Sequence, residues 1–433
     1  MHAPAHETPP DATSTLPPDL PQQAVELAAD LLAASHHHDT PASRAHAKKI
    51  AALLADPDAK SFTLDLTDRV LRSPSPRTAA HALHTILARH GTPKFLRPFE
   101  RLLLHIANTT ARFLPGIVVP QINAHLRRDT RTVVVPAAKK TLHKFLNSRN
   151  TNNFRTNLNL LGEAVLGEQE AASRLQQNLD TLADPKVTYL SVKLSAVFSQ
   201  INLVAYENTL DQLQTRLRSL YRAALDHGNS QHGTPKFINL DMEEYRDLHL
   251  TFDTFTRTLA EPEFKNLHAG IVLQAYLPDA AGLQQKLTTW ARGRVTDGGA
   301  PIKVRLVKGA NLAMEKVDAS VHGWPLATHA TKLDTDANFK RMLEFACRPG
   351  NATAVNLGVA SHNLFDIAYA LLLRDHFGTA NQVTFEMLTG MAEPHAAAVR
   401  DQANDLLLYA PAVHDHDFHA AIAYLVRRLD ENT

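Results

Sequence analysis

Apolar residues recur three and four positions apart through the first third of the chain, which is the spacing of helices with one buried face. The spacing is clearest in AVELAADLLAAS, ASRAHAKKIAALLAD, RTAAHALHTILARH and FLRPFERLLLHIANTTARFL, some of which are separated by Pro and Gly. We therefore predict a helical arm or cap over residues 23–150, without catalytic residues. Residues 1–22 are rich in Pro, His, Asp and Thr, so we predict a disordered tail.

After Asn153 the pattern changes to short runs of branched apolar residues, each followed by enough chain for a helix. The eight runs are Asn157–Ala164, Tyr189–Ala196, Lys236–Glu243, Gly270–Leu277, Ile302–Ala310, Ala354–Asn363, Val383–Met391 and Leu406–Val413. Such alternation is typical of a (β/α)8 barrel, which we predict over residues 151–433. An open doubly wound sheet is the main alternative, but no GxGxxG follows a strand and GxxxxGK[ST] is absent.

The last predicted helix, Phe418–Glu431, has apolar residues at helical spacing: Ile422, Leu425, Val426 and Leu429. Arg427 and Arg428 are adjacent near its end, followed by Glu431. Two guanidiniums beside a buried stripe can hold a small carboxylate, because Arg presents planar, paired donors. A solvated helix end with an Arg–Glu surface pair is the simpler interpretation of this stretch alone.

Composition narrows the class of protein. The chain has 433 residues and a formal net charge of +1, so its charge does not call for a nucleic-acid partner. A single cysteine, Cys347, cannot form an internal disulfide, and neither a membrane-length apolar run nor a secretory leader is visible. We expect a cytoplasmic protein. His36, His37 and His38 are consecutive, and solvated histidines explain them better than a metal site.

Polar residues stand at or near the ends of the predicted strands, where barrel enzymes place their catalytic groups. They are Glu163, Lys193, Asp241, Gln274, Arg305 with Lys308, His362, Glu386 and Tyr409. Each alone could be a helix cap or an ion pair. Together they do not suit a metal hydrolase, since His362 is the only histidine among them and HExxH is absent, and no Ser or Cys stands out as a nucleophile. Gln274, Arg305, Lys308 and His362 are donors suited to an anionic cofactor, and the small residues Gly309 and Ala310 allow close approach.

Several long motifs resemble the proline dehydrogenase domain of flavin-dependent proline catabolism, most closely that of the bacterial bifunctional type (proline utilisation A). They are KLSA from Lys193, NLDMEEYRDL from Asn239, GIVLQAY from Gly270, RLVKGAN from Arg305, HGWP from His322, TKLDTDANFKRML from Thr331, ASHN from Ala360, FEMLTGMAE from Phe385 and YLVRRLDEN from Tyr424. The resemblance extends from about Asn153 to Thr433. It implies a distorted barrel with the last helix over a flavin.

The family resemblance implies oxidation of L-proline to Δ1-pyrroline-5-carboxylate, with a hydride passing to FAD and electrons then to a membrane quinone. It implies FAD contacts from Asp241, Val272, Gln274, Arg305, Val307, Gly309, Ala310, Lys332, Ala360, Ser361, His362, Glu386 and Leu388. It assigns the substrate to Lys193, Leu388, Tyr409, Tyr424, Arg427 and Arg428. Lys193, Asp241, Arg305, Tyr409, Arg427, Arg428 and Glu431 form the implied catalytic set, and Glu163 pairs with Arg427 as a gate. No metal is implied.

Two departures affect these expectations. Asn311 and Leu312 stand where many bifunctional members have Tyr and Trp, so a proline analogue such as hydroxyproline is an alternative substrate. The chain stops at Thr433, where relatives continue into an aldehyde dehydrogenase domain, so a single-function enzyme and a piece of a bifunctional one both stay open. A pyrroline-5-carboxylate dehydrogenase and peripheral contact with the membrane are then candidate partners. A non-catalytic barrel that senses a carboxylate is the alternative of another class.

Overall fold

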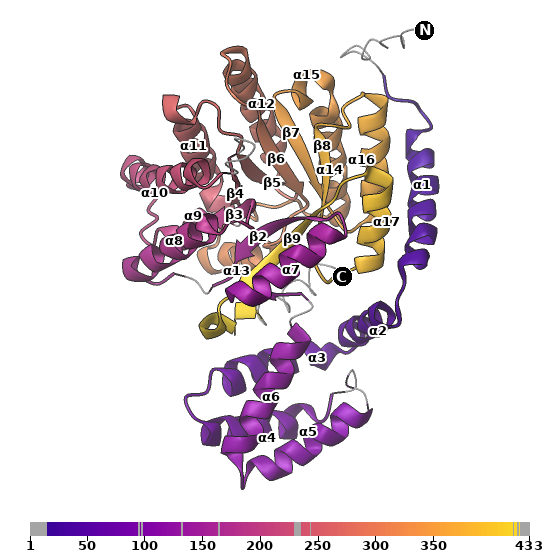
Figure 1. Ribbon diagram of the computed structural model, residues 1–433, viewed down its shortest axis with the longest axis vertical. Helices are drawn as coiled ribbons and strands as arrows, with labels where there is room; N and C mark the ends of the chain where they lie inside the picture. Colours follow the sequence, from indigo (N-terminus) through magenta and orange to yellow (C-terminus); the bar gives the residue numbers. More distant parts are fainter. Residues whose placement is uncertain are drawn as a thin grey trace.

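The computed structural model describes residues 15–93, 96, 98–130, 133–162, 165–228, 235–242, 244–418, 420, 421 and 424. In this part of the chain, eight parallel strands close into a barrel wrapped by helices (Figure 1). The strands are β2 (Arg155–Leu160), β3 (Tyr189–Lys193), β4 (Phe237–Asp241), β5 (Gly270–Gln274), β6 (Ile302–Val307), β7 (Val355–Ala360), β8 (Val383–Leu388) and β9 (Leu407–Val413). The barrel closes because β9 pairs with both β8 and β2. The predicted fold is confirmed, and the open sheet is wrong.

Each predicted strand is present, and each ends earlier than expected or at the same residue. The outer layer comprises α8 (Glu168–Ala183), α9 (Leu194–Val197), α10 (Tyr206–Asp226), η3 (Tyr245–Asp247), α11 (Leu248–Leu259), η4 (Pro262–Phe264), α12 (Ala280–Thr296), α13 (Leu312–His322), α14 (Lys332–Cys347), α15 (Pro349–Ala352), α16 (Leu364–His376), α17 (Glu393–Ala403) and η5 (Asp415–Asp417). The outward-facing residues of the strands are mostly apolar because helices cover the outer face of the barrel. Among the described residues, no helix combines the length and apolar character needed to cross a bilayer.

A short additional strand, β1 (Val135–Pro136), was not predicted. It pairs with Ala412 and Val413 of β9, beyond Tyr409, where the pairing of β9 with β8 ends. The helix α7 (Lys139–Thr151) follows and contacts β1 and β2. Two residues are too few to produce an alternating pattern in the sequence, so only the tertiary pairing reveals this strand.

The first helix, α1 (Leu20–Ser35), packs against α16 and α17 of the barrel. It begins inside the segment that we predicted to be a disordered tail, because Leu20 is buried with Ala24, Ala28 and Leu31, and Pro21 stands in the first turn where its missing N–H costs nothing. The tail prediction is therefore wrong for residues 20–22. Residues 1–14 lie outside the described residues.

The helical arm is confirmed, and its helices are α2 (Pro41–Ala55), α3 (Pro57–Leu66), a π-helical turn η2 (Thr67–Leu71), α4 (Pro76–His90), α5 (Pro98–Ala111) and α6 (Pro115–Thr130). A three-residue turn, η1 (His36–His38), precedes them. Residues from η2 and from α3 to α6 form a separate apolar core that includes Phe62, Leu83 and Ile86. By contrast, α1, β1 and α7 contribute to the core of the barrel. The expected division at residue 150 thus does not coincide with the division between the two cores.

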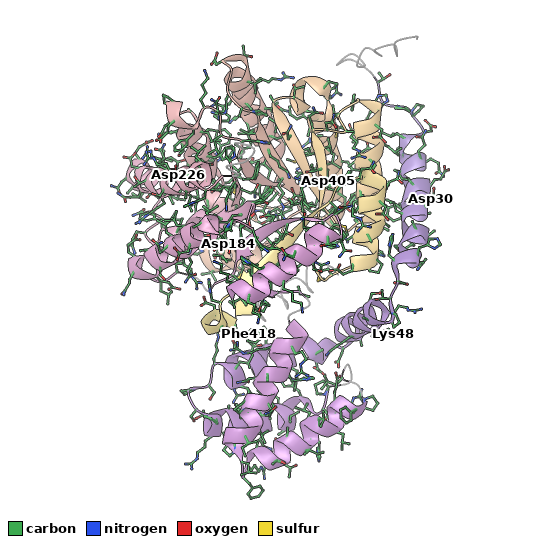
Figure 2. All side chains as sticks on the ribbon, viewed as in Figure 1. Asp30, Lys48, Asp184, Asp226, Asp405 and Phe418 are labelled. Atoms are coloured by element: carbon green, nitrogen blue, oxygen red, sulfur yellow. The ribbon has the colours of Figure 1, made fainter. Side chains whose placement is uncertain are left out.

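The arm meets the barrel near the end of the described chain (Figures 1 and 2). Arg127 of α6 donates to Asp415 at 3.1 Å, and its guanidinium lies 4.5 Å from the centre of the Phe418 ring. Phe418 belongs to a small apolar cluster with Val133, Val134, Leu161, Val413, Ala421 and Tyr424. This cluster fixes the start of the last predicted helix against the barrel.

Candidate active site

The pairing register determines which strand residues face the inside of the barrel. Adjacent strands align Arg305 with Val272 and with Gly358, and Ala360 with Glu386, and every second residue then points the same way. Following these pairs around the barrel places a polar set on the inner face: Asn157, Asn159, Ser191, Lys193, Asn239, Asp241, Gln274, Lys303, Arg305, Thr384, Glu386 and Tyr409. A barrel interior is usually filled by branched apolar side chains, so this polarity marks a functional interior.

Arg305 lies at the centre of this set. Its Nε is 3.0 Å from Glu386 Oε2, and its Nη1 is 3.5 Å from Asp241 Oδ1. Burial alone would lower the pKa of Arg305, but the two carboxylates raise it above its ordinary value. Burial likewise favours a neutral Glu386, yet Lys303 and Arg305 hold its pKa below the ordinary value. Both side chains are therefore charged at neutral pH.

Lys303 is the second cation in the interior. It is 5% exposed, and its Nζ lies 2.6 Å from Glu386 Oε1. Burial lowers the pKa of Lys303, and the Glu386 carboxylate opposes this effect. The ion pair passes across β7 at Gly358, which has no side chain in the way.

Tyr409 joins Asp241 to the opposite side of the barrel. Its hydroxyl donates to Asp241 Oδ2 at 2.7 Å and accepts from the Asn159 amide. The Arg305 guanidinium lies 4.3 Å from the centre of the Tyr409 ring. We expected Tyr409 near a strand end. It is instead the third residue of β9, but its long side chain still reaches the residues at the mouth.

The loop after β6 forms one wall of the mouth. The Ala310 N–H donates to Gln274 Oε1 at 3.3 Å, and Tyr276 donates its backbone N–H to the Lys308 carbonyl at 2.6 Å. Gly309 has a φ of +147°, and a Cβ there would overlap the Tyr276 ring. Only glycine fits this turn, because its missing side chain lets the Tyr276 ring pack against the backbone of the loop.

Lys308 does not serve as the free donor that we expected. Its Nζ lies 2.5 Å from Asp336 Oδ1 and 2.7 Å from Asp366 Oδ2. Lys340 binds the other oxygen of Asp366 at 3.0 Å. Burial opposes the charge of Lys308, but the two carboxylates raise its pKa. We interpret this network as holding α14 and α16 against the end of β6.

The remaining expected flavin residues surround the same mouth. His362 Nε2 accepts the Leu388 N–H at 2.9 Å, which requires the proton of a neutral His362 to be on Nδ1. Val272, Val307, Ala360 and Leu388 are on the inner faces of β5 to β8, whereas Ser361 follows β7 directly and its hydroxyl lies 3.5 Å from Asp366. Lys332 begins α14 and is exposed.

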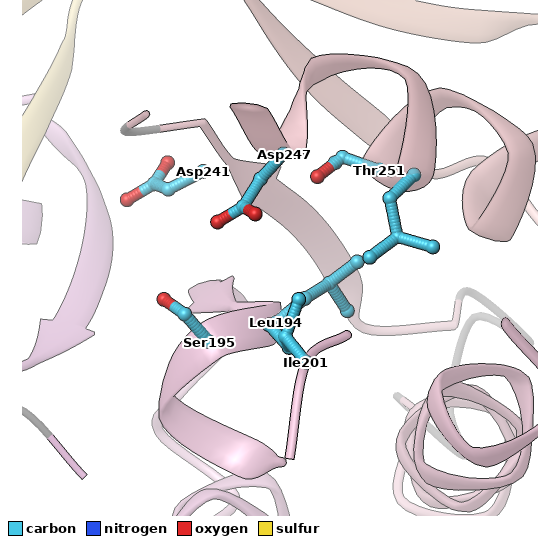
Figure 3. Close-up of a pocket in the computed structure, with 7 residues that line it drawn as sticks. Leu194, Ser195, Ile201, Asp241, Asp247 and Thr251 are labelled. Atoms are coloured by element: carbon cyan, nitrogen blue, oxygen red, sulfur yellow. The ribbon is translucent and has the colours of Figure 1, made fainter. Parts of the chain in front are cut away.

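A small pocket lies beside Asp241, on the other side of the mouth (Figure 3). It is lined by Leu194, Ser195, Ile201, Asp241, Asp247, Leu250 and Thr251. Lys193 is the last residue of β3, directly before the lining residues of α9, and it pairs in register with Asp241. The expected substrate residue Lys193 and the central Asp241 are thus neighbours on adjacent strands.

The family model described as proline dehydrogenase matches residues 142–433. The chain belongs to the proline dehydrogenase family. Family members are oxidoreductases, and the resemblance stated from the motifs is confirmed.

Among curated relatives, the bifunctional protein PutA of Escherichia coli is 29% identical over 305 residues, which cover 64% of this chain and 21% of the relative. PutA of Salmonella typhimurium is 25% identical over 401 residues, covering 87% and 27%. A solved PutA from Corynebacterium freiburgense is 46% identical with a TM-score of 0.67, covering 78% of this chain and 34% of that one. PutA from Bdellovibrio bacteriovorus inactivated by N-propargylglycine is 26% identical with a TM-score of 0.79, covering 96% and 42%. This chain thus spans 21–27% of the curated relatives' length.

Glu163, Arg427, Arg428 and Glu431 lie outside the described residues, as do Ile422, Leu425, Val426 and Leu429. Tyr424 is described and is 8% exposed within the cluster around Phe418. Nearby, Arg174 binds Asp417 at 2.8 Å, and Gly162 leaves room for its guanidinium.

Sequence reasoning missed Asn239, which donates to Asp241 at 3.1 Å, and it also missed Lys303 and Asn159. The latter two lie two residues away from polar groups on the same strand face, Lys303 from Arg305 and Asn159 from Asn157. Strict alternation within IKVRLV and NLNL was the available signal. We expected solvated histidines at 36–38. The His36 side chain is exposed and lies 3.7 Å from Asp39, whereas His38 is partly buried and lies 3.0 Å from Asp401. The described residues contain no group suited to a metal ion.

Proposed function

We propose that this chain oxidises L-proline to Δ1-pyrroline-5-carboxylate with FAD held in the barrel mouth, and that the electrons pass on to a quinone. One observation supports this most. Apart from Asp241 on β4, the inward residues implied for the flavin fall on four consecutive strands, β5 to β8, whereas Lys193 and Tyr409, implied for the substrate, come from β3 and β9. Cofactor and substrate would then occupy facing halves of one mouth.

The residues present suit a flavin. Its ring has carbonyl and nitrogen acceptors along one edge and apolar faces, and the mouth offers the Gln274 amide and the Arg305 guanidinium beside apolar walls from Val272, Val307 and Leu388. When bound, a flavin would supply the hydride acceptor that no amino-acid side chain provides.

The protein's own groups would bind and orient the substrate. Lys193, with Arg427 and Arg428 by family likeness, would hold the carboxylate, while Tyr409 and Leu388 would limit movement of the ring. Arg305 would place positive charge next to the redox centre, where negative charge increases during the reaction. A neutral substrate amine favours loss of hydride from the adjacent carbon, so no strong general base is required.

Purified protein tests this proposal directly. It should be yellow, release FAD on denaturation, and bleach when L-proline is added without oxygen. Arg305→Met should leave a folded protein with weakened flavin binding. A colourless protein, or one that releases FMN, would reject the cofactor. A yellow protein that does not bleach with proline would favour the non-catalytic carboxylate-binding barrel.

Substrate range depends on Asn311, which is half-buried directly after the Gly309 loop, and on the partly exposed Leu312. Both are smaller than the aromatic residues common in the family, and a roomier pocket would admit hydroxyproline. Comparing kcat/KM for L-proline and hydroxyproline tests this. We also propose that the protein acts in the cytoplasm, in peripheral contact with the membrane that holds its quinone, and that a pyrroline-5-carboxylate dehydrogenase uses its product.

A further inference from the structure

Lys303 is a buried cation to which the proposed reaction gives no role. A buried lysine costs free energy unless it is paired, and an apolar residue of the same volume often packs more stably. The Lys303 ammonium nevertheless lies beside Glu386 on the inner face of the barrel, two residues before Arg305 on the same strand. Its position indicates an electrostatic role.

The barrel has space for this pair at Gly358. Lys303 is on β6 and Glu386 on β8, so β7 separates them. A Cβ at Gly358 would lie 2.7 Å from Lys303 Cε and would overlap Glu386 Oε1. A side chain on β7 would therefore block the ion pair, and the glycine permits it.

The ion-paired cluster of Lys303, Glu386, Arg305 and Asp241 is neutral only when Lys303 is included, and Lys193 lies outside this cluster at the end of β3. Glu386 binds Lys303 through one oxygen and Arg305 through the other, and Arg305 also faces Asp241. Two cations thus face two carboxylates. Nearby, Arg155 is paired with Asp405, Tyr189 is neutral because burial raises its pKa well above the ordinary value, and His268 is neutral at pH 7 because burial and Lys303 lower its pKa to about 4.

We propose that Lys303 is a positioning residue that neutralises Glu386 from behind and so leaves the positive charge of Arg305 available to the redox centre at the barrel mouth. This inference rests on the proposed flavin function. Without Lys303 the set would have a net charge of −1, Glu386 would act on Arg305 alone, and reduction of the bound flavin would become less favourable.

A double-mutant cycle that neutralises each charge tests the proposal in the flavin-loaded protein. The variants are Lys303→Met, Glu386→Gln and the double variant, and the readout is the flavin midpoint potential measured against a reference dye. Lys303→Met should lower the equilibrium constant for reduction on the order of tenfold, as expected for one charge at an effective dielectric constant near 20. Glu386→Gln should raise it, and the double variant should return close to the unmutated protein. Lys303→Arg should keep the charge and the potential.

Opposite shifts are the signature of an electrostatic role, because a structural defect would loosen the flavin in both single variants and move both the same way. Shifts in the same direction, or no shift, would overturn the inference. If Lys303→Met does not fold, Glu386→Gln and the double variant still decide it, since their potentials must differ. If the unmutated protein holds no flavin, both proposals are wrong. If it is yellow and is reduced by proline but the two single variants do not shift the potential in opposite directions, only this inference is wrong.

Discussion

At the residue scale, the effect of a substitution on a barrel strand depends on whether the residue faces the interior or the covering helices. Gly358 faces inward, and its missing Cβ leaves room for the Lys303–Glu386 pair. Gly358→Ala should lower the free energy of unfolding by about 1–3 kcal/mol, the usual cost of overpacking. Urea denaturation would measure this. Gly282→Ala is the matched control, because a Cβ on that α12 glycine meets nothing within 4 Å. It should be neutral or slightly stabilising, and equal effects of the two changes would contradict the crowding at Gly358.

The carboxylate clamp predicted from the last helix can also be tested by single changes. Losing one partner of a desolvated charge pair costs roughly 2–5 kcal/mol, so Arg428→Met should reduce kcat/KM for proline by tens to thousands of times. Arg428→Lys keeps the positive charge but loses the planar, paired donors of Arg, so its loss in kcat/KM should be the second largest. Glu163→Ala should be mildest, because it only frees the gate partner of Arg427. Steady-state kinetics with a soluble quinone would check the order, and a normal KM in Arg428→Met would return these residues to a solvated helix end.

At the scale of elements, the junction of η4 with β5 should make the barrel sensitive to acid. His268 packs edge-on against Phe237 at 5.0 Å and hydrogen-bonds the backbone at Ile302, and burial lowers its pKa to about 4. The unfolded chain binds this proton near pH 6.5, but the folded chain binds it only near pH 4. Stability should therefore fall as the pH drops through that window, by roughly 3 kcal/mol at about 1.4 kcal/mol per pKa unit.

His268→Asn removes the titrating group while keeping a polar side chain. The unfolding free energy of this variant, measured in urea from pH 7 to pH 4, should decline less steeply than that of the unmutated protein. Protonation of carboxylates such as Glu386 also destabilises the folded protein in acid, but this effect is present in both proteins. Parallel curves for the two proteins would rule out His268 as a source of the acid sensitivity.

At the scale of the whole molecule, we propose that α1 belongs to the folding unit of the barrel and that α2 to α6 form a separate unit. Leu31 is 2% exposed and belongs to the barrel core, whereas its neighbour Leu32 is 45% exposed. Leu31→Ala should destabilise the barrel by about 2–5 kcal/mol, and Leu32→Ala should stay within about 0.5 kcal/mol. The unfolding temperature of the barrel can be measured by monitoring the release of flavin on heating. An unchanged release temperature in Leu31→Ala would assign α1 to the arm.

The two separate cores also determine where a shortened chain that contains the barrel should begin. A chain beginning near Asn150 keeps every residue implied for the site, and from the sequence alone it should retain flavin and turnover if it stays soluble. The structure shows that this cut removes α1, β1 and most of α7, which cover apolar residues of the barrel. We therefore expect such a chain to aggregate, whereas one beginning at residue 15 should match the full chain in solubility and turnover.

The sequence by itself determined the eight barrel strands, the helical arm and most mouth residues, because alternation, helical spacing and long motifs are local properties of the chain. Asp241, Gln274 and Arg305 were identified in this way. The tertiary structure alone decided that Lys303 pairs with Glu386 across Gly358, that Lys308 is held by Asp336 and Asp366, and that α1 and β1 belong to the barrel. These contacts join residues far apart in the chain, and they form only when the strands and helices come together in the closed barrel, which no local pattern encodes.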